Sequence, residues 1–324
     1  MNIQQEVSVT YGTDDLGANT LLIIGNGFDL DLGLKTRYSD FAKSSFWPFR
    51  YRIFGLGGYL NLYQYSDHWF DLEARIAKYC EKSFHKYLPK RIQKRIEEAD
   101  GRDDAIIIKN LWLYLSEEEK RMHLTQEYND NSVACRLLKD VCTSLIPGSI
   151  YSFNYTDLKQ LSLDLGKDVA VGCNPIYVHG TLKERDIILG FNDGRRVVDY
   201  YNRFVKYRRK DYTPSSLFDA IEKYSTIIFF GLSFGEIDTP YFSGFFDRFL
   251  RGELKDKCVR IITRNNESRQ EVMTNLSIMT KSNLSLYKGF NLEVITTDGS
   301  MTKQLTDLFS HLESRATASN FSIV

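Results

Sequence analysis

Short, mainly apolar runs alternate with helical patterns along most of the chain. The first run, Leu21-Leu22-Ile23-Ile24, is apolar at every position, which is typical of a strand that is buried on both faces. Further runs in which apolar residues predominate or alternate with polar ones lie at 149–155, 168–173, 176–180, 187–191, 226–230, 259–263 and 292–296. Because helical segments separate most of these runs, we predict an α/β fold with a Rossmann-like, doubly wound and mainly parallel sheet.

Helices are predicted where apolar positions recur every three or four residues. These segments are 131–145, 214–224, 238–250, 268–278 and 302–312. Pro147-Gly148 would end the first of them, and Thr213 would cap the second, with Pro214 at its first position. The first helix of the chain is expected to open within 39–47.

Residues 50–130 differ in composition and pattern from the rest of the chain, because charged and aromatic residues dominate and clear strand patterns are scarce. Helical patterns lead through Cys80 and over 84–99, and Ser116-Glu117-Glu118-Glu119 is typical of a helix start. We predict that 50–130 form a helical insertion or cap on a Rossmann-like nucleotide-binding core made of 1–49 and 131–316. Residues 317–324 are expected to be a frayed tail.

Composition narrows the classes of protein that the chain can belong to. Lysine and arginine total 42 and so do aspartate and glutamate, so no global charge draws the protein to nucleic acid or to anionic membrane. The basic run 203–210 favours a solvated charged face, with a nucleic-acid contact as the alternative. With five cysteines in no CxxC pattern, no secretion signal and no membrane-spanning run, we expect a cytoplasmic protein with reduced thiols and no metal.

Several of the apolar runs end in polar turns, most of them with glycine. The turns are Gly25-Asn26-Gly27, Asn154-Tyr155-Thr156-Asp157, His179-Gly180, Gly190-Phe191-Asn192-Asp193 and Gly231-Leu232-Ser233. In open α/β sheets, ligands bind at the carboxyl ends of the strands, near the point where the strand order reverses. We therefore expect these turns to converge on one crevice. The alternative for the first turn is a tight strand-to-helix connection without a ligand, because its glycine fingerprint is incomplete.

Taken together, the motifs resemble those of the bacterial AbiH abortive-infection family. The residues that carry the resemblance are Gly25-Asn26-Gly27-Phe28-Asp29, Trp69-Phe70-Asp71-Leu72-Glu73, Ser152-Phe153-Asn154-Tyr155-Thr156, His179-Gly180 and Gly231-Leu232-Ser233-Phe234-Gly235-Glu236-Ile237-Asp238. The resemblance extends from residue 21 to about residue 300. It implies a role in defence against bacteriophage.

The same turns are more distantly similar to the sirtuin-like NAD-binding fold. That similarity implies that Gly25-Asn26-Gly27 cradles the pyrophosphate, that Asn154 meets the nicotinamide ribose and that His179 is the catalytic histidine. It also implies that the turn from Gly231 to Ser233 lines the adenosine end. The chain departs from the pattern at Thr156, where the sirtuin-like turn has Asp, and at Asn26, which replaces a small Ala.

Each candidate also has a structural interpretation. His179 is the best candidate base, because imidazole titrates near neutral pH, and the alternative is a turn histidine bonded to backbone. Asn154 would hold the ribose or orient water, and otherwise it would stabilise its own turn. Asp29 would bind a ribose hydroxyl or cap a helix. Asp193 and Asp238 are carboxylates that would face the site or serve as caps or surface charges.

Two further motifs are expected to carry no chemistry of their own. Asp71 and Glu73 are two residues apart and diverge on a helix, so a metal pair is not expected. Trp69 is expected to pack, with Asp71 capping a helix, and the alternative places this segment as a lid over the crevice. Ser233 lies in no GxSxG pattern and has no base partner in sequence, which excludes a serine hydrolase.

We therefore predict an anti-phage protein that binds NAD or a related adenine nucleotide and hydrolyses its nicotinamide–ribose bond. Cleavage of this bond passes through an oxocarbenium-like state that a carboxylate or amide oxygen stabilises. The predicted catalytic residues are His179 and Asn154, and the predicted binding residues are Gly25, Asn26, Gly27, Asp29, Asn154, Gly231 and Ser233. The alternatives are a non-catalytic nucleotide-sensing module and, more weakly, a toxin that targets nucleic acid. A homo-oligomer is left open.

Overall fold

The computed structural model describes residues 20–63, 71–81, 87–140, 150–166, 175–192, 197, 199–209, 212, 215–281 and 291–308. Its centre is a six-stranded sheet with the order β3-β2-β1-β4-β5-β6, and every pair of neighbouring strands is parallel. The chain leaves β1 toward β2 and β3, then returns to add β4, β5 and β6 on the other side. This is the doubly wound Rossmann-like order, and it places the reversal of strand order between β1 and β4.

The strands lie where the apolar runs predict them. Their bounds are β1 Thr20–Ile24, β2 Ile150–Ser152, β3 Ile176–Tyr177, β4 Thr226–Phe230, β5 Cys258–Thr263 and β6 Leu292–Thr296. β1 and β4 are buried at every position and pair residue for residue, from Thr20 with Thr226 to Ile24 with Phe230. Alternate side chains of both strands enter opposite cores, which is why neither strand carries a polar face.

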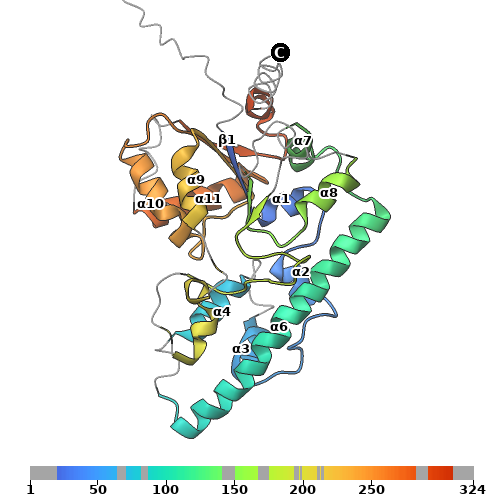
Figure 1. Cartoon of the computed structure of the whole chain (residues 1–324), viewed down its shortest axis with the longest axis vertical. Helices are drawn as coiled ribbons and strands as arrows, with labels where there is room; N and C mark the ends of the chain where they lie inside the picture. The colour runs from blue at the N-terminus through green and yellow to red at the C-terminus, as the bar shows by residue number, and fades with distance from the viewer. Residues whose placement is uncertain are drawn as a thin grey trace, which may run out of the picture.

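Helices cover both faces of the sheet (Figure 1). On one face, α9 (Ser215–Lys223), α10 (Thr239–Leu250) and α11 (Asn266–Thr280) enclose the core that contains Phe229. On the other face, α1 (Asn26–Asp31), α7 (Val133–Asp140) and α8 (Leu158–Asp164) enclose the core that contains Phe230. The sheet and the helices on its two faces form three layers. Because all neighbouring strands are parallel, their carboxyl ends lie at the same edge of the sheet.

A third core lies beside the sheet, within a mainly helical part of the molecule. It is built from α2 (Tyr38–Lys43), α3 (Gly55–Tyr63), α4 (Leu72–Cys80), α6 (Lys90–Thr125), η2 (Asp199–Phe204) and the residues 182–191. α6 has 36 residues and runs the length of this part (Figure 1). The short η3 (Lys206–Arg208) follows η2. The core therefore joins residues of the predicted insertion to residues that come before and after it in sequence.

Three sequence expectations are wrong. Residues 187–191 form no strand beyond a single bridge between Phe191 and Val205, because the Gly190 amide donates to a Glu73 carboxylate oxygen rather than to a neighbouring strand. The first helix opens at Asn26, directly after β1, rather than within 39–47. Ser116 lies inside α6 rather than at a helix start, because the buried stripe of this helix continues from Leu115 to Met122.

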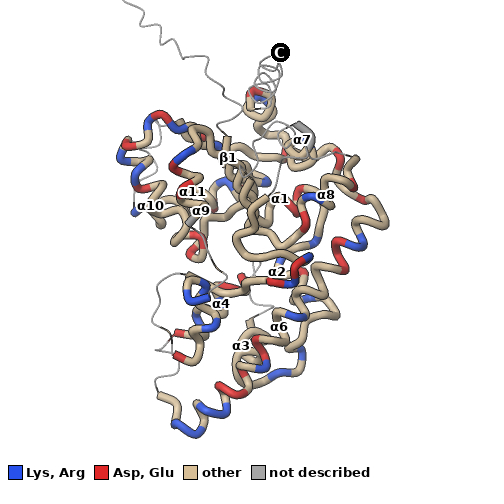
Figure 2. Tube along the Cα trace, viewed as in Figure 1, with Lys and Arg blue, Asp and Glu red and all other residues tan. Residues whose placement is uncertain are grey.

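Some expected features lie outside the described residues. They are the run 168–173, Trp69, Pro147-Gly148, Thr213, Pro214, Asp193, Cys142, Cys173 and the tail from residue 309 onward. Cys80 is a buried free thiol. Basic and acidic residues are interspersed along most of the trace (Figure 2), in keeping with the balanced net charge. Within the described ranges, no helix has the length and apolar character needed to cross a membrane.

Candidate functional site

A cavity of about 960 Å³ opens at the carboxyl ends of β1, β2, β4 and β5. Every site residue predicted from the sequence lines it: Gly25, Asn26, Gly27, Asp29, Asn154, His179, Gly231 and Ser233. These residues come from four segments that are distant in sequence, and the reversal of strand order between β1 and β4 brings them to one edge. The expected convergence on a single crevice is therefore confirmed for four of the five polar turns, whereas Gly190, Phe191 and Asn192 of the remaining turn do not line the cavity.

The two glycine turns at this reversal pack directly on each other. The Gly25 amide donates to the Phe230 carbonyl oxygen (2.8 Å) and the Gly27 amide to the Gly231 carbonyl oxygen (3.0 Å). A Cβ atom on Gly27 would lie 2.5 Å from the Gly231 Cα atom, and Gly231 has a φ of 72°. Close approach of the two turns thus requires these glycines. Their amides are already bonded, and α1 has only six residues, so the turn offers few backbone donors to a ligand.

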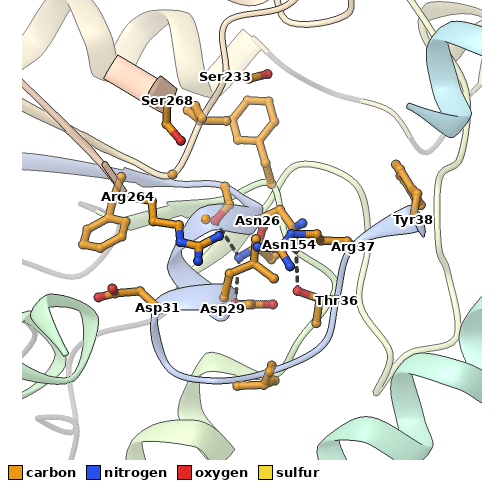
Figure 3. Close-up of a pocket in the computed structure, with 18 of the residues that line it drawn as sticks. Asn26, Asp29, Asp31, Thr36, Arg37, Tyr38, Asn154, Ser233, Arg264 and Ser268 are labelled. Carbon is orange, nitrogen blue, oxygen red and sulfur yellow. Dashed lines mark hydrogen bonds between the residues drawn. The ribbon is translucent and has the colours of Figure 1, made fainter. Parts of the chain in front are cut away.

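Asp29, Asn154 and Thr156 form a buried polar cluster in the cavity wall (Figure 3). The Asn154 Nδ2 atom donates to the Asp29 Oδ1 atom (2.8 Å) and to the Gly25 carbonyl oxygen (3.0 Å). The Thr156 hydroxyl donates to the Asp29 Oδ2 atom (2.9 Å). Burial raises the pKa of Asp29 to about 7, although both hydrogen bonds favour the ionised form.

These contacts revise two readings of the sequence. Asp29 does not cap α1, whose N-cap is Gly25; it lies within the helix and faces the turn after β2. Thr156, which stands where the sirtuin-like pattern has Asp, supplies a hydroxyl to the Asp29 carboxylate. An aspartate at 156 would place a second negative charge against this buried carboxyl group, so the hydroxyl fits the environment better. Asp157, the next residue, caps α8 by accepting from the Lys159 and Gln160 amides.

His179 is buried at the cavity wall, and its ring is held from several sides. Its Nε2 atom lies 3.0 Å from the Lys206 Nζ atom and 3.0 Å from the Tyr241 hydroxyl. Because an ammonium group only donates, Nε2 is the acceptor, and the imidazole is neutral. Burial and the Lys206 charge lower the pKa of His179 well below its ordinary value, while a backbone hydrogen bond at Phe153 acts in the opposite direction.

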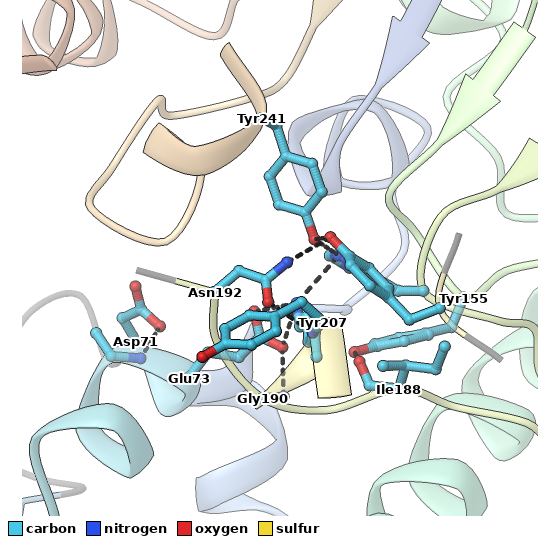
Figure 4. A network of polar contacts seen from close by, with 12 residues as sticks. Asp71, Glu73, Tyr155, Ile188, Gly190, Asn192, Tyr207 and Tyr241 are labelled. Carbon is cyan, nitrogen blue, oxygen red and sulfur yellow. Dashed lines mark hydrogen bonds and ion pairs between the residues drawn. The ribbon is translucent and has the colours of Figure 1, made fainter. Parts of the chain in front are cut away.

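Lys206 contacts Glu73 and His179 in a polar network that the sequence did not predict. Figure 4 shows other members of this network, among them Glu73, Asn192 and Tyr241. The Lys206 ammonium group is fully buried and lies 3.0 Å from the Glu73 Oε1 atom. Tyr241 and Tyr212 share a hydrogen bond, and Asn192 donates to Tyr212 (2.7 Å). The expected solvated face at 203–210 is therefore wrong at Lys206, although Tyr207 is exposed. In the sequence, the apolar pair Phe204-Val205 that precedes Lys206 is the signal that could have indicated its burial.

A family model for the bacteriophage abortive infection protein AbiH matches residues 21–255. The chain belongs to the AbiH family. No curated protein and no solved structure matches it. Within this AbiH-family chain, the matched region contains every predicted site residue, and it ends before β5.

The AbiH-family cavity also holds a group of carboxyl side chains. Asp71 caps α4 by accepting from the Ala74 amide (3.0 Å), as expected, yet Asp71 and Glu73 both line the cavity rather than diverging from it. Burial, together with the nearby charges of Asp71 and Glu73, raises the pKa of Asp238 to about 7, and the charge of Lys206 acts in the opposite direction. The described ranges contain no group of three or more His, Cys, Asp or Glu side chains able to hold a metal ion.

Proposed function

We propose that this AbiH-family protein binds NAD or a related adenine nucleotide in the cavity and hydrolyses the nicotinamide–ribose bond. The observation that carries the proposal is the convergence of the predicted residues on one cavity at the strand-order reversal, the usual ligand position in open α/β sheets. Buried carboxyl groups within that cavity support hydrolysis in particular, because they stabilise positive charge that develops on a ribose.

In the proposed reaction, the bond between ribose C1′ and the nicotinamide nitrogen breaks, and both electrons stay on the leaving nitrogen. Water then forms the new C1′–O bond and gives up a proton. Asn154 holds the ribose beside Asp29, whose carboxylate stabilises the oxocarbenium-like state. His179 accepts the proton from water, since its neutral imidazole has one nitrogen without hydrogen.

The network around His179 sets a condition for this proton transfer. Its Nε2 atom already accepts from Lys206, so that hydrogen bond must be exchanged for one from water or a ribose hydroxyl. Lys206 retains Glu73 as a partner on its other side, which makes the exchange feasible without leaving a buried ammonium group unpaired. Lys206 is therefore proposed to control when His179 can act as a base.

Nicotinamide release from NAD by the purified full chain tests the proposal. Wild type should release nicotinamide, and His179→Ala and Asn154→Ala should reduce the rate by about 100-fold or more, as expected for loss of a general base or a ribose ligand. His123→Ala is the matched control, because His123 lies on α6 and pairs with Asp164 outside the cavity lining. Equal background rates for wild type and His179→Ala would reject hydrolysis.

The geometry at His179 also favours the alternative, a nucleotide-sensing module without turnover. Both groups that contact Nε2 occupy the side of the imidazole that would accept the proton. Calorimetry that shows tight NAD binding without nicotinamide release would support sensing, and no binding to any adenine nucleotide would end both proposals. The basic run gives a nucleic-acid toxin little support, since Lys206 is buried against Glu73.

A further inference from the structure

Two arginines that lie outside the predicted site line the same cavity. Arg37 precedes α2, and Arg264 directly follows β5. Figure 3 shows their side chains reaching toward Asn26 and Asn154 from opposite sides. Two guanidinium groups on opposite sides of one space suit an anion that presents oxygens in two directions.

Neither guanidinium group has an ion-pair or hydrogen-bond partner within the described part of the chain. Two carboxylates of the lining already accept from backbone amides. Asp31 accepts from the Ala134 amide (2.9 Å), and Asp298 accepts from the Ser300 amide (3.0 Å). Since arginine stays protonated at every physiological pH, these two positive charges remain available to a ligand.

The other residues of the lining also favour a position between Arg37 and Arg264 for an anion. The amides of Gly25 and Gly27 donate to the backbone of the facing turn, so side chains must supply the donors. Asp71, Glu73 and Asp238 lie close to one another in the lining, and a phosphate group would be repelled there. A ligand with an anionic middle and a neutral or cationic ring would therefore place its phosphates between the arginines.

We propose that Arg37 and Arg264 bind a diphosphate group, with one guanidinium on each phosphate. The identity of the nucleotide that carries the diphosphate rests on the proposed function, whereas the anion site itself does not. Bidentate pairing of guanidinium with phosphate gives both affinity and orientation. The arginines would thus set the direction in which a dinucleotide lies along the cavity.

Calorimetric titration of the full chain with inorganic pyrophosphate, at low salt, tests the site directly. Arg37→Gln and Arg264→Gln should each weaken binding by about 10- to 100-fold, the usual effect of losing a charge-assisted hydrogen bond. Arg91→Gln and Arg95→Gln are the controls, because they remove the same charge from exposed positions of α6 outside the cavity lining. These controls should bind pyrophosphate as wild type does.

Three results would overturn the diphosphate site. They are the absence of pyrophosphate binding, equal affinities in the arginine variants and the controls, and orthophosphate binding as tight as pyrophosphate binding. Measurements with NAD distinguish failure of the diphosphate site from failure of the proposed function. If wild type cleaves NAD and both arginine variants keep its KM, the diphosphate site fails and hydrolysis stands. If pyrophosphate binding depends on the arginines but NAD is not cleaved, the site stands and hydrolysis fails.

Discussion

Asp29→Asn should remove a pH dependence of stability that the wild-type protein carries. The substitution keeps the size of the side chain, and its amide can still accept from Asn154 and donate to the Thr156 hydroxyl oxygen. What it removes is the titration of a buried carboxyl group. The variant therefore isolates one ionisable group in the cavity wall without emptying the space that it fills.

The direction in which stability changes with pH follows from the pH range over which Asp29 is protonated in the folded protein. Burial raises its pKa from the ordinary 3.8 to about 7 in the folded protein, so between these values the folded state is protonated and the unfolded chain is not. The folded state then binds more protons, and stability falls as the pH rises through this window. At about 1.4 kcal/mol per pH unit, the loss amounts to about 4 kcal/mol above pH 7.

Urea unfolding at pH 5 and at pH 8 measures this effect. Wild type should lose about 2 to 3 kcal/mol more than Asp29→Asn between the two conditions, because only the part of the window above pH 5 is sampled. Asp238, whose pKa is also raised to about 7, owes none of that shift to Asp29 and cancels in the comparison. The Asp29 charge helps to raise the pKa of Glu119, so that part of the Glu119 contribution is lost together with the titration of Asp29. Asp219→Asn, on the exposed side of α9, should behave as wild type. Identical losses in wild type and Asp29→Asn would refute the buried carboxyl group as a source of the pH dependence.

The remaining predictions concern packing and charge near the cavity. Gly231→Ala should lower the free energy of unfolding by more than about 2 kcal/mol, since its Cβ would lie 2.4 Å from the facing turn. Gly299→Ala shares the positive φ but meets open space, so equal losses would refute the close approach. Glu73→Gln should cost about 3 to 5 kcal/mol by leaving a buried ammonium group unpaired, and adding Lys206→Met should restore part of it. Glu253→Gln, in an exposed pair, should cost under about 1 kcal/mol, and a similar cost at Glu73 would contradict the buried pair.

The sheet and the convergence of its turns could be predicted from the sequence because both depend on local signals. A run such as 227–230 is apolar at every position only when both faces are covered, and the glycine after it marks where the strand ends. Parallel strands end on the same edge, so the turns could be placed together without knowing the order of the strands. The apolar run at 187–191 shows the limit of this signal: the pattern reports burial, and the segment is buried in the third core rather than paired in the sheet.

The parts that could not be predicted depend on distant partners or on elements too short to show a period. α1 has six residues, fewer than two full turns, so no helical repeat can appear in its sequence. Lys206 sits in a basic run, where a lysine is usually solvated, and only Glu73, 133 residues earlier, makes its burial tolerable. Arg37 and Arg264 carry no motif, and only the fold brings both to the cavity.

The site carries its carboxyl group at position 29 and a hydroxyl at position 156, where the sirtuin-like pattern has Asp. For catalysis, the presence of that carboxyl group matters more than the position that supplies it. Asp29 and Thr156 are in contact, and a second carboxylate at position 156 would be repelled by the buried Asp29 carboxylate. Thr156 is therefore no argument against hydrolysis, because the carboxyl group is present on the neighbouring element. With a pKa of about 7, Asp29 is ionised in part of the molecules at neutral pH, and a nearby cation favours that form. Under the proposed function, the cationic nicotinamide ring of NAD would itself promote the carboxylate that stabilises its departing ribose.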